Sequence, residues 1–365
     1  MNIICYVNKL SGGGAERVMS VLANGMSRLG HNVILVTDYS TPGEYPVDTE
    51  VKRIVLDGEF TGITTKGMLR RTWRRLTDLN KLCRENSTDV LVSFMKDGNF
   101  RALLATRFTK TANLISVRID PKIGYRDKKS AMIAKTIYRW AGGCVFQTAE
   151  AQAWFPERIQ RKSRVILNPI SDVFYQTKGQ PTKEKRIVCC GRLEKQKNFA
   201  LLIAAFDKIA DRYPEYQLDI YGVGSLCEEL QKQIDGLGRS EQICLRGTCE
   251  NVPETIKNAS LFVLSSDYEG LPNALMEAMA LGLPVVSTDC GGGGARALIE
   301  HGVNGLMVPC NDVDAMAEAI EQNLAHPEAA KLRGERAAQT AKQFSVENIV
   351  TLWERYISEI AEDAI

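Results

Sequence analysis

The sequence has few of the residues, and none of the long apolar runs, that mark several common classes of protein. Its 365 residues contain only three histidines, His31, His301 and His326, and none stands at metal-ligand spacing from a cysteine or another histidine. The ten cysteines form no C-x-x-C pair, so we expect free, buried thiols in a reducing cytosol. No run of about 18 apolar residues is present, which argues against an encoded transmembrane helix.

The N-terminal segment, residues 1–7, has neither a basic stretch nor a long apolar stretch. We therefore expect a first β-strand there and not a signal peptide. A chain of this length is too long for one ordinary core and suits two domains of about 150–200 residues each. The formal net charge of +2 argues, taken as a single number, against a protein that binds nucleic acid or a membrane surface.

That total conceals two opposed charges. Up to Pro169 the chain has 27 Lys and Arg against 15 Asp and Glu, a net charge of +12. The remainder has 19 against 29, a net charge of −10. The split favours a cytoplasmic enzyme that is peripheral on the inner face of the membrane, with its basic first half against the anionic lipid. Nucleic acid is not an expected partner.

Short apolar runs alternate with helical periodicity along the whole chain. The predicted strands are residues 3–7, 33–36, 90–92, 114–117, 143–146, 187–190, 218–221, 243–245, 261–264 and 284–287. Such alternation is typical of parallel sheets with helices on both faces. The chain turns polar around residues 168–169 and through 179–185, which predicts a linker between two doubly wound α/β domains. A last helix is expected from about Val346 to Ile360, with an apolar seam at Ile349, Leu352, Tyr356 and Ile360.

A glycine-rich loop follows the first predicted strand and opens a helix. Its pattern, Gly12-x-Gly14-x-x-Arg17, resembles a dinucleotide fingerprint, and Asp38 ends the second strand where a ribose-binding acid would lie. Arg17, however, occupies a position that needs glycine or alanine for close helix–strand packing. A tight turn that needs small residues explains the loop as well as a ligand does, although its amides at a helix start favour an anion.

The most informative stretch runs from residue 265 to residue 284. A buried strand ends at Leu264, a loop carries Glu269, Pro272 suits the first turn of a helix, and Glu277 lies inside that helix. The amides at the helix start offer a seat for phosphate, with two carboxylates nearby. The Glu-x7-Glu spacing alone is weak evidence, so the context of strand, Glu-Gly, Pro and second Glu carries the prediction.

Two cations and several glycines follow neighbouring strands of the same half. Arg192 and Lys197, five residues apart in a strand-to-helix loop, can converge on a diphosphate, although a solvated basic loop would look the same. Gly222, Gly224 and Gly247 end the next strands and permit close approach of a ligand. A plain turn would also use glycines at these positions. Open α/β sheets bind ligands at these carboxyl ends of strands.

Together these residues resemble the retaining nucleotide-sugar glycosyltransferases of the GT-B fold, family four, also called glycosyl transferases group one. The resemblance covers nearly the whole chain and is most specific over residues 269–284, 191–193 and 197–198. It implies two Rossmann-like domains that face each other across a cleft. Residues 1–169 would bind the acceptor, residues 170–345 would bind the nucleotide sugar, and a C-terminal helix at about 346–365 would cross back to the first domain.

The resemblance also implies a role for individual residues. Arg192 and Lys197 would stabilise the departing diphosphate, and Glu269 would contact the donor sugar. The other donor-binding residues would be Gly14, Gly222, Gly224, Gly247, Gly270, Leu271, Asn273, Ala274 and Glu277. Fixed cations and helix-end amides can replace a divalent ion at the leaving group, so no metal and no further cofactor is expected. Asp312-Val313-Asp314 is the one Asp-x-Asp match and looks like a helix start.

One departure concerns the first domain. Many family members carry a histidine there near the reacting sugar, and no histidine lies between His31 and His301. The segment Ser116–Pro121 occupies that position and looks like the Arg-x-Asp-Pro variant of polysaccharide and lipid-linked glycan enzymes. We assign Arg118 and Asp120 to acceptor binding, while a structural Asp-Pro turn explains Asp120 equally well.

Residues Lys66–Leu76 contain five cations and no acid. If helical, the segment has an apolar stripe at Met68, Leu69, Trp73 and Leu76, flanked by arginines, which suits an anionic membrane surface. The alternative is an ordinary surface helix that packs Trp73 inward.

The sequence thus predicts a retaining, metal-independent glycosyltransferase. It would move a hexose or N-acetylhexosamine from a UDP-sugar to a glycan acceptor linked to a lipid pyrophosphate. UDP is preferred over GDP on family frequency alone. The alternatives are a non-hydrolysing sugar-nucleotide epimerase on the same fold and an NAD-dependent dehydrogenase.

Overall fold

The computed structural model describes residues 1–59, 67–177, 179 and 184–363. The chain divides into two compact units: the first is Met1–Pro169 with Val346–Ile365, and the second is Ile170–Ser345. Residues 180–183 of the predicted linker, and Lys66 of the basic segment, lie outside the described residues. Ile170 and Ser345, which bound the second unit, form a parallel β-bridge with each other.

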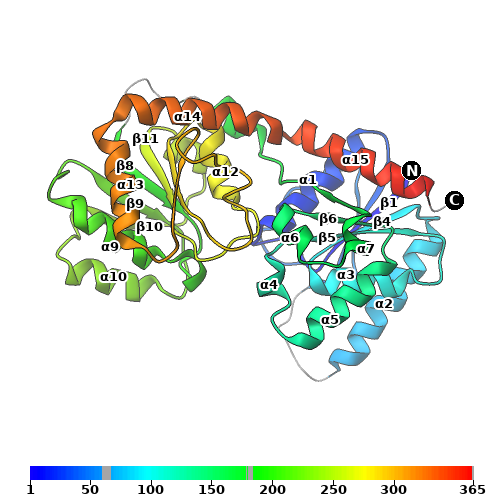
Figure 1. Ribbon diagram of the computed structural model, residues 1–365. Coiled ribbons are helices and arrows are strands. Elements are labelled where there is room, and N and C mark those ends of the chain that lie inside the picture. The colour runs from blue at the N-terminus through cyan, green and yellow to red at the C-terminus, as the bar shows by residue number, and fades with distance from the viewer. Residues whose placement is uncertain (60–66, 178, 180–183, 364–365) are drawn as a thin grey trace. The chain divides into compact units, whose positions relative to one another are not determined.

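The first unit contains a parallel sheet of seven described strands in the order β3-β2-β1-β4-β5-β6-β7. Figure 1 labels β1, β4, β5 and β6 of this sheet. The strands are β1 (Asn2–Val7), β2 (Asn32–Thr37), β3 (Lys52–Val55), β4 (Val90–Phe94), β5 (Ala112–Val117), β6 (Gly143–Phe146) and β7 (Ser163–Val165). The helices are α1 (Gly14–Arg28), α2 (Met68–Glu85), α3 (Lys96–Ala105), α4 (Pro121–Gly124), α5 (Lys128–Ile137), α6 (Ala149–Ala153), α7 (Glu157–Gln160) and α15 (Val346–Glu362), with a 3-10 turn η1 (Tyr138–Trp140).

Helices cover both faces of this sheet. Leu79 of α2 and Ala102 of α3 share a buried cluster with Leu91 of β4. Phe94, three residues after Leu91, points to the other face, where its ring meets Trp353 of α15 at 5.6 Å between centroids. Helix α15 therefore returns to the first unit, as the resemblance implied.

The second unit repeats this architecture with a described six-stranded parallel sheet in the order β10-β9-β8-β11-β12-β13. Its strands are β8 (Glu184–Cys190), β9 (Gln217–Tyr221), β10 (Ile243–Gly247), β11 (Ala259–Leu264), β12 (Val285–Thr288) and β13 (Leu306–Val308). Its helices are α8 (Asp172–Gln176), α9 (Phe199–Ala210), α10 (Cys227–Gly236), α11 (Val252–Ile256), α12 (Asn273–Ala280), α13 (Val313–Ala325) and α14 (Pro327–Ala341), with 3-10 turns η2 (Lys195–Lys197) and η3 (Lys342–Phe344).

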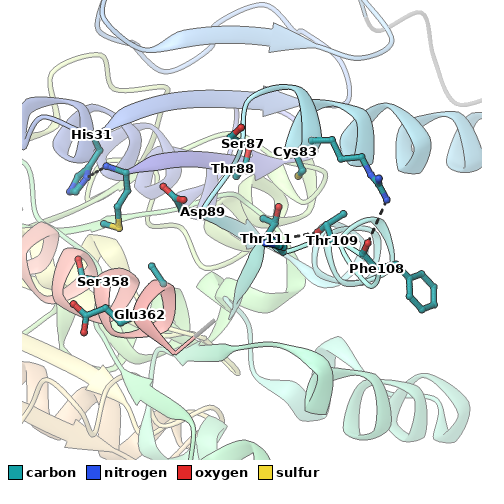
Figure 2. Close-up of a pocket in the computed structure, with 14 residues that line it drawn as sticks. His31, Cys83, Ser87, Thr88, Asp89, Phe108, Thr109, Thr111, Ser358 and Glu362 are labelled. Atoms are coloured by element: carbon teal, nitrogen blue, oxygen red, sulfur yellow. Dashed lines mark hydrogen bonds between the residues drawn. The ribbon is translucent and has the colours of Figure 1, made fainter. Parts of the chain in front are cut away.

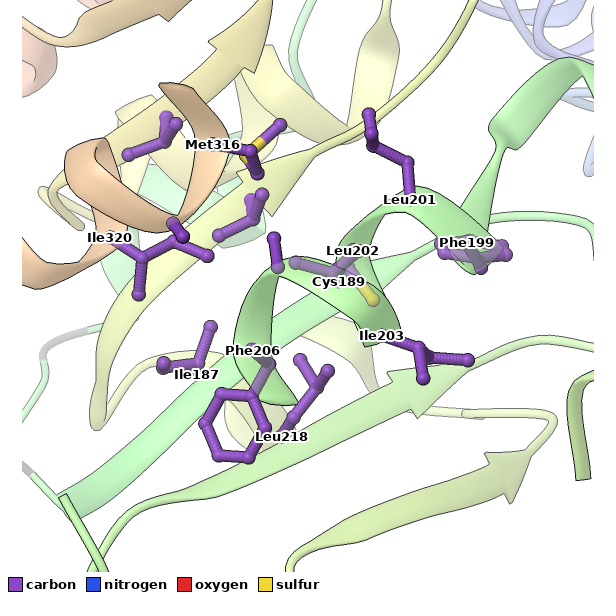
Figure 3. Close-up of a cluster of buried hydrophobic side chains, with 14 of the residues drawn as sticks. Ile187, Cys189, Phe199, Leu201, Leu202, Ile203, Phe206, Leu218, Met316 and Ile320 are labelled. Atoms are coloured by element: carbon purple, nitrogen blue, oxygen red, sulfur yellow. The ribbon is translucent and has the colours of Figure 1, made fainter. Parts of the chain in front are cut away.

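The core of the second unit lies between this sheet and helices α9 and α13. Leu202 and Phe206 of α9, Met316 of α13 and Leu218 of β9 are fully buried together (Figure 3). Burying one such side chain stabilises the fold by about 1.5–3 kcal/mol. Helices α12 and α14 pack on each other and contact β12.

The predicted fold class is confirmed in both units, with local corrections. Strands β3, β7 and β13 were not among the predicted strands; each has three or four residues and lies at or next to a sheet edge. In α15 the predicted seam is wrong at Leu352, which is 45% exposed, while Trp353 is fully buried. Pro272 is the N-cap of α12 and not a residue of its first turn.

All ten cysteines are free, although Cys227 is exposed and so departs from the expectation of buried thiols. Within the described residues, no helix combines the length and the apolarity needed to cross a bilayer.

Candidate functional site

The candidate donor residues lie where the strand order of the second sheet reverses. β8 and β11 are neighbours at its centre, and the chain leaves them toward opposite edges. Such a switch point opens a crevice at the carboxyl ends of the strands, because the two following loops diverge. The loop after β8 carries Lys197, and the loop after β11 carries Glu269.

Buried Glu269 and half-buried Lys197 form an ion pair. Nζ of Lys197 lies 2.6 Å from Oε1 of Glu269, and the side chains are 16% and 8% exposed. Ser266 Oγ donates to the same carboxylate oxygen at 2.7 Å, and Gln196 Nε2 donates to Oε2 at 3.3 Å. Because Oε2 accepts only this one long hydrogen bond, from a neutral donor, among the described residues, it keeps capacity to accept from a ligand hydroxyl.

The two loops are also tied together beside this pair. Asn198 has a left-handed backbone (φ 44°) and caps α9 by accepting from the Leu201 amide, while its Nδ2 donates to Asp267 at 2.7 Å. Ser265 Oγ donates to the Lys197 carbonyl at 2.8 Å. These bonds fix the Lys197 backbone against the β11 loop, so the ammonium is held in place before any ligand arrives.

Helix α12 begins beside the same loop. Its N-cap is Pro272, which has no side-chain acceptor, so no cap hydrogen bond covers the first amides. The Leu271 and Ala274 amides have no hydrogen-bond partner among the described residues. Amides of this kind at a helix start favour an anion. Asn273 also lies in this first turn and already interacts with another group of the chain.

Glu277 lies one turn further along α12 and is buried. Its carboxylate lies close enough to Cys190, the last residue of β8, to affect that thiol: burial foremost, and then Glu277, raise the pKa of Cys190 to about 12. The same thiol also feels Lys197. The structure thus brings Lys197, Glu269 and Glu277 around the end of β8.

Within the described residues, Arg192 makes no hydrogen bond or ion pair with this cluster. Its side chain is exposed on the bend after β8 and has no hydrogen bond or ion pair within the described part of the chain. Its role at the leaving group remains a prediction.

The predicted donor-binding glycines have structural reasons of their own. A Cβ at Gly222 would collide with the Gly191 carbonyl oxygen, and one at Gly224 with that of Leu193. Gly247 has φ +70°, a backbone conformation that favours glycine. These features explain Gly222, Gly224 and Gly247 without a ligand, and donor binding through them and through Gly270 remains a prediction.

Sequence reasoning missed Ser266, Gln196 and Cys190. Ser266 and Gln196 hydrogen-bond to the Glu269 carboxylate, and the charges of Glu277 and Lys197 both act on the Cys190 thiol. The positions of the first two, three residues before Glu269 and next to Lys197, were a usable signal. Cys190 was read only as part of a buried strand.

In the first unit the glycine loop opens α1, which begins at Gly14 with Gly13 as its N-cap. The supposed ribose acid, Asp38, is 1% exposed and already bound. Its carboxylate pairs with Arg101 at 3.0 Å and Arg75 at 3.1 Å, and accepts from the Tyr6 hydroxyl at 2.7 Å. A carboxylate engaged in this way is not available to a ribose, which counts against the dinucleotide interpretation.

Arg118 and Asp120 follow β5 at the carboxyl edge of the first sheet, and both are buried. The Asp120 carboxylate accepts from the Lys122 amide at 2.9 Å and caps α4, which begins at Pro121. That is the structural Asp-Pro turn. Arg118 lies over the Phe94 ring at 4.5 Å.

Among the described residues, no three His, Cys, Asp or Glu side chains are grouped so as to hold a metal ion. A cavity of about 1220 Å³ lies in the first unit, at the amino-terminal edge of its sheet (Figure 2). It is lined by His31, Asp89, Thr111 and Glu362 among others, and by none of the predicted site residues.

Comparisons with known proteins identify the relatives of this chain. Residues 172–340 match the family model described as Glycosyl transferases group 1. A Campylobacter jejuni enzyme, named as GalNAc-alpha-(1->4)-GalNAc-alpha-(1->3)-diNAcBac-PP-undecaprenol alpha-1,4-N-acetyl-D-galactosaminyltransferase, is 26% identical over 99% of both chains. HepE of Anabaena, solved with UDP, superimposes with a TM-score of 0.80 at 19% identity, over 98% of this chain and all of that one.

A sucrose-phosphate synthase of Thermosynechococcus elongatus superimposes with a TM-score of 0.85 at 17% identity, over the whole of both chains. These structural likenesses show the fold. With the full-length relative, the chain is a glycosyltransferase of the GT-B fold, and residues 172–340 of its second unit match the glycosyl transferases group 1 model.

Proposed function

We propose that the chain is a retaining, metal-independent transferase that moves a hexose or N-acetylhexosamine from a UDP-sugar to a lipid-linked glycan. The observation that carries the proposal is the Lys197–Glu269 pair at the switch point of the second sheet, beside the uncapped start of α12. The ammonium of Lys197, the Leu271 and Ala274 amides and the Oε2 acceptor of Glu269 thus lie at the carboxyl ends of the neighbouring strands β8 and β11.

That arrangement matches the charge changes of sugar transfer. The acceptor oxygen bonds to the anomeric carbon while the bond from that carbon to the diphosphate oxygen breaks; the leaving group keeps the electron pair, and the proton of the acceptor hydroxyl passes to the departing diphosphate. Lys197, Arg192 and the α12 amides would stabilise the charge that develops on this oxygen, which is the role a divalent ion would otherwise fill. Glu269 would hold a sugar hydroxyl through Oε2, and Glu277 the ribose hydroxyls. In a retaining transfer the acceptor attacks on the face that the diphosphate leaves.

The acceptor class is proposed from two relatives. One is the N-acetylgalactosaminyltransferase reported above, whose name specifies an undecaprenol-diphosphate acceptor. The other, from the same organism, is named as acting on N-acetylgalactosamine-N,N'-diacetylbacillosaminyl-diphospho-undecaprenol, and it is 25% identical over 93% of this chain and 94% of its own. We infer a glycan on a polyprenyl diphosphate as the acceptor here.

A lipid-linked acceptor requires the enzyme to reach a membrane surface. At the start of α2, Leu69 is 83% and Trp73 69% exposed, so Trp73 does not pack inward. Exposed Arg70 and Arg74 lie beside them. A stripe of exposed apolar residues between arginines is the composition of helices that lie on anionic bilayers.

Helix α5 adds to this surface. Helix α5 shares a buried cluster with Leu103 of α3, and α3 also packs against α2. Helices α2 and α5 therefore lie on the same face of the sheet. On α5, Met132 and Ile133 are exposed beside Lys128 and Lys129. With α15 counted in, the first unit carries a net charge of +8 and the second −6. We propose that the exposed faces of α2 and α5 form the membrane contact.

The two alternative enzymes lack comparable support. The named relatives above are transferases, which disfavours an epimerase. A dehydrogenase would need Asp38, which two arginines already engage.

The test is incubation of the purified protein with a panel of labelled UDP-sugars and an undecaprenyl-diphosphate-linked glycan, with EDTA present. We expect label in the lipid fraction that EDTA does not reduce. Nucleotide-sugar epimerisation without transfer, or consumption of NADH, would reject the proposal in favour of one of the two alternatives.

A further inference from the structure

Arg118 is a buried cation without a buried anion. It is 8% exposed, and its guanidinium has only neutral partners: Nη1 lies 3.5 Å from Ser116 Oγ, Nη2 donates to Asn168 Oδ1, and Nε has no acceptor. Its face lies over the Phe94 ring. No carboxylate of the described chain offsets the charge, and burial lowers the pKa of Arg118 to about 9.

Comparison with other buried arginines shows that this arrangement is unusual for the chain. Arg101 is equally buried, and it pairs with Asp38 at 3.0 Å. Arg333 also lacks a carboxylate, but it lies within α14 against Asn323 of α13, away from any strand end. Arg118 combines an uncompensated charge with a place at the carboxyl edge of a parallel sheet, where ligands bind.

Two neighbouring features point to a ligand at the same edge. Gln147 follows β6, the strand beside β5; its Nε2 donates to Asn168 Oδ1 at 2.9 Å, and its buried Oε1 has no hydrogen-bond partner in the described part of the chain. On the other side, Met95 follows β4 with a left-handed φ of 70° and leads into α3 without a side-chain cap. Backbone strain and orphaned polar atoms of this kind gather at functional sites.

Burying an unpaired guanidinium costs several kcal/mol unless a ligand supplies the counter-charge. A phosphate oxygen suits the guanidinium, and a hydroxyl beside that phosphate would satisfy Gln147 Oε1. We propose that Arg118 binds a phosphate group of the substrates, with Asn168 and Phe94 as the residues that position it. This rests on the proposed function, in which donor and acceptor each carry a diphosphate.

Binding measurements on the intact protein separate the two sources of phosphate. Inorganic pyrophosphate titrated in the presence of saturating UDP reports the acceptor's phosphate, and UDP titrated alone reports the donor's. In Arg118→Met we expect one of these affinities to fall roughly 10- to 100-fold, since a charge-assisted bidentate contact is lost. The affinity that falls identifies the source.

Asn168→Asp provides a second variant that keeps the guanidinium. Both contacts given for Asn168 above use its oxygen as an acceptor, so a carboxylate preserves them and supplies the missing anion. We expect the same affinity to fall as in Arg118→Met. Lys122→Gln is the matched control, because Lys122 is an exposed cation in the same segment whose ammonium pairs with Glu150 at the surface; we expect this variant to bind pyrophosphate and UDP as the wild type does.

Thermal unfolding distinguishes a binding arginine from a structural one. Removal of an uncompensated buried charge should raise the Tm of Arg118→Met, whereas loss of a structural guanidinium would lower it. Unchanged affinity for both pyrophosphate and UDP in both variants would overturn the proposal. These titrations measure binding and not turnover. If the transfer reaction fails, that failure counts against the proposed function, and the binding data still test the role of Arg118.

Discussion

Lys197 and Glu269 meet across the centre of the second sheet, with Nζ 2.6 Å from Oε1. One residue follows β8 and the other follows β11, so the fold brings them together from positions 72 residues apart. Glu269 is buried, and Ser266 and Gln196 hold its carboxylate from two further directions. It is therefore both a structural contact and the candidate centre of donor binding, and the two roles can be separated by mutation.

The structural role is measured by a double-mutant cycle. Lys197→Met leaves the Glu269 carboxylate buried without its cation, which should lower the free energy of unfolding by about 3–5 kcal/mol. Adding Glu269→Gln removes the orphaned charge and should restore most of that loss. Denaturant unfolding of the four proteins gives the values, and additive effects would show that the two side chains do not interact.

The chemical role of Glu269 is tested by Glu269→Gln alone. This variant keeps the size of the side chain but removes the charge that would hold a sugar hydroxyl. We expect the transfer rate to fall roughly 10²- to 10³-fold. Glu318→Gln, an exposed change on α13 in the same unit, is the control and should be unaffected. Full activity in Glu269→Gln would remove Glu269 from the mechanism.

Ser266 and Gln196 illustrate what the sequence could not provide. The strand, the Glu-Gly turn and the second glutamate predicted where the site lies, because their order and spacing can be read directly along the chain. Which hydroxyl or amide contacts the carboxylate depends on how two loops pack. The same holds in α15, where Leu352 and Trp353 are adjacent and both apolar, and only the packing against Phe94 shows which is buried.

The environment of the Arg118 charge could not be predicted from the sequence either. The sequence indicated a cation at the acceptor side, but an arginine in a strand-end loop is normally solvated or paired. That its charge is buried and uncompensated follows only from the positions of Ser116, Asn168 and Gln147. The polar, short edge strands β3 and β7 were missed because neither offers a long apolar run.

Ser266→Ala should act through Glu269. Loss of the 2.7 Å hydrogen bond to Oε1 frees the carboxylate to rotate, while Lys197 still pairs with it. We expect KM for the donor to rise roughly 5- to 10-fold, in line with the loss of one hydrogen bond to a charged group. Ser266→Thr, which keeps the hydroxyl, should recover most of the affinity. No difference between the alanine and threonine variants would contradict this positioning role.

The proposed membrane contact is tested by flotation with liposomes. Replacing Leu69 and Trp73 by serine removes the most exposed apolar side chains of α2, so binding to vesicles that contain anionic lipid should fall at least 10-fold. Leu29→Ser changes an exposed leucine at the end of α1, outside the proposed contact, and should bind as the wild type does. Binding should also weaken as salt rises, and salt-independent binding would argue against an electrostatic component.

The cysteines provide a check on the fold itself. Burial raises the pKa of the Cys5 and Cys144 thiols to about 12, so they stay protonated and inaccessible at pH 8. Cys227 is exposed. Mass spectrometry after a short treatment with iodoacetamide should find Cys227 modified first, and Cys5 and Cys144 only after unfolding. Equal labelling of Cys5 and Cys227 in the native protein would contradict the structure.

The central claim is that the switch point of the second sheet binds a nucleotide diphosphate through Lys197 without a metal. Calorimetric titration of UDP into the protein in EDTA tests it directly. We predict saturable binding by the wild type and by Glu318→Gln, and an affinity at least 10-fold weaker in Lys197→Met. Equal affinity in the wild type and in folded Lys197→Met, or binding that disappears with EDTA, would contradict the account.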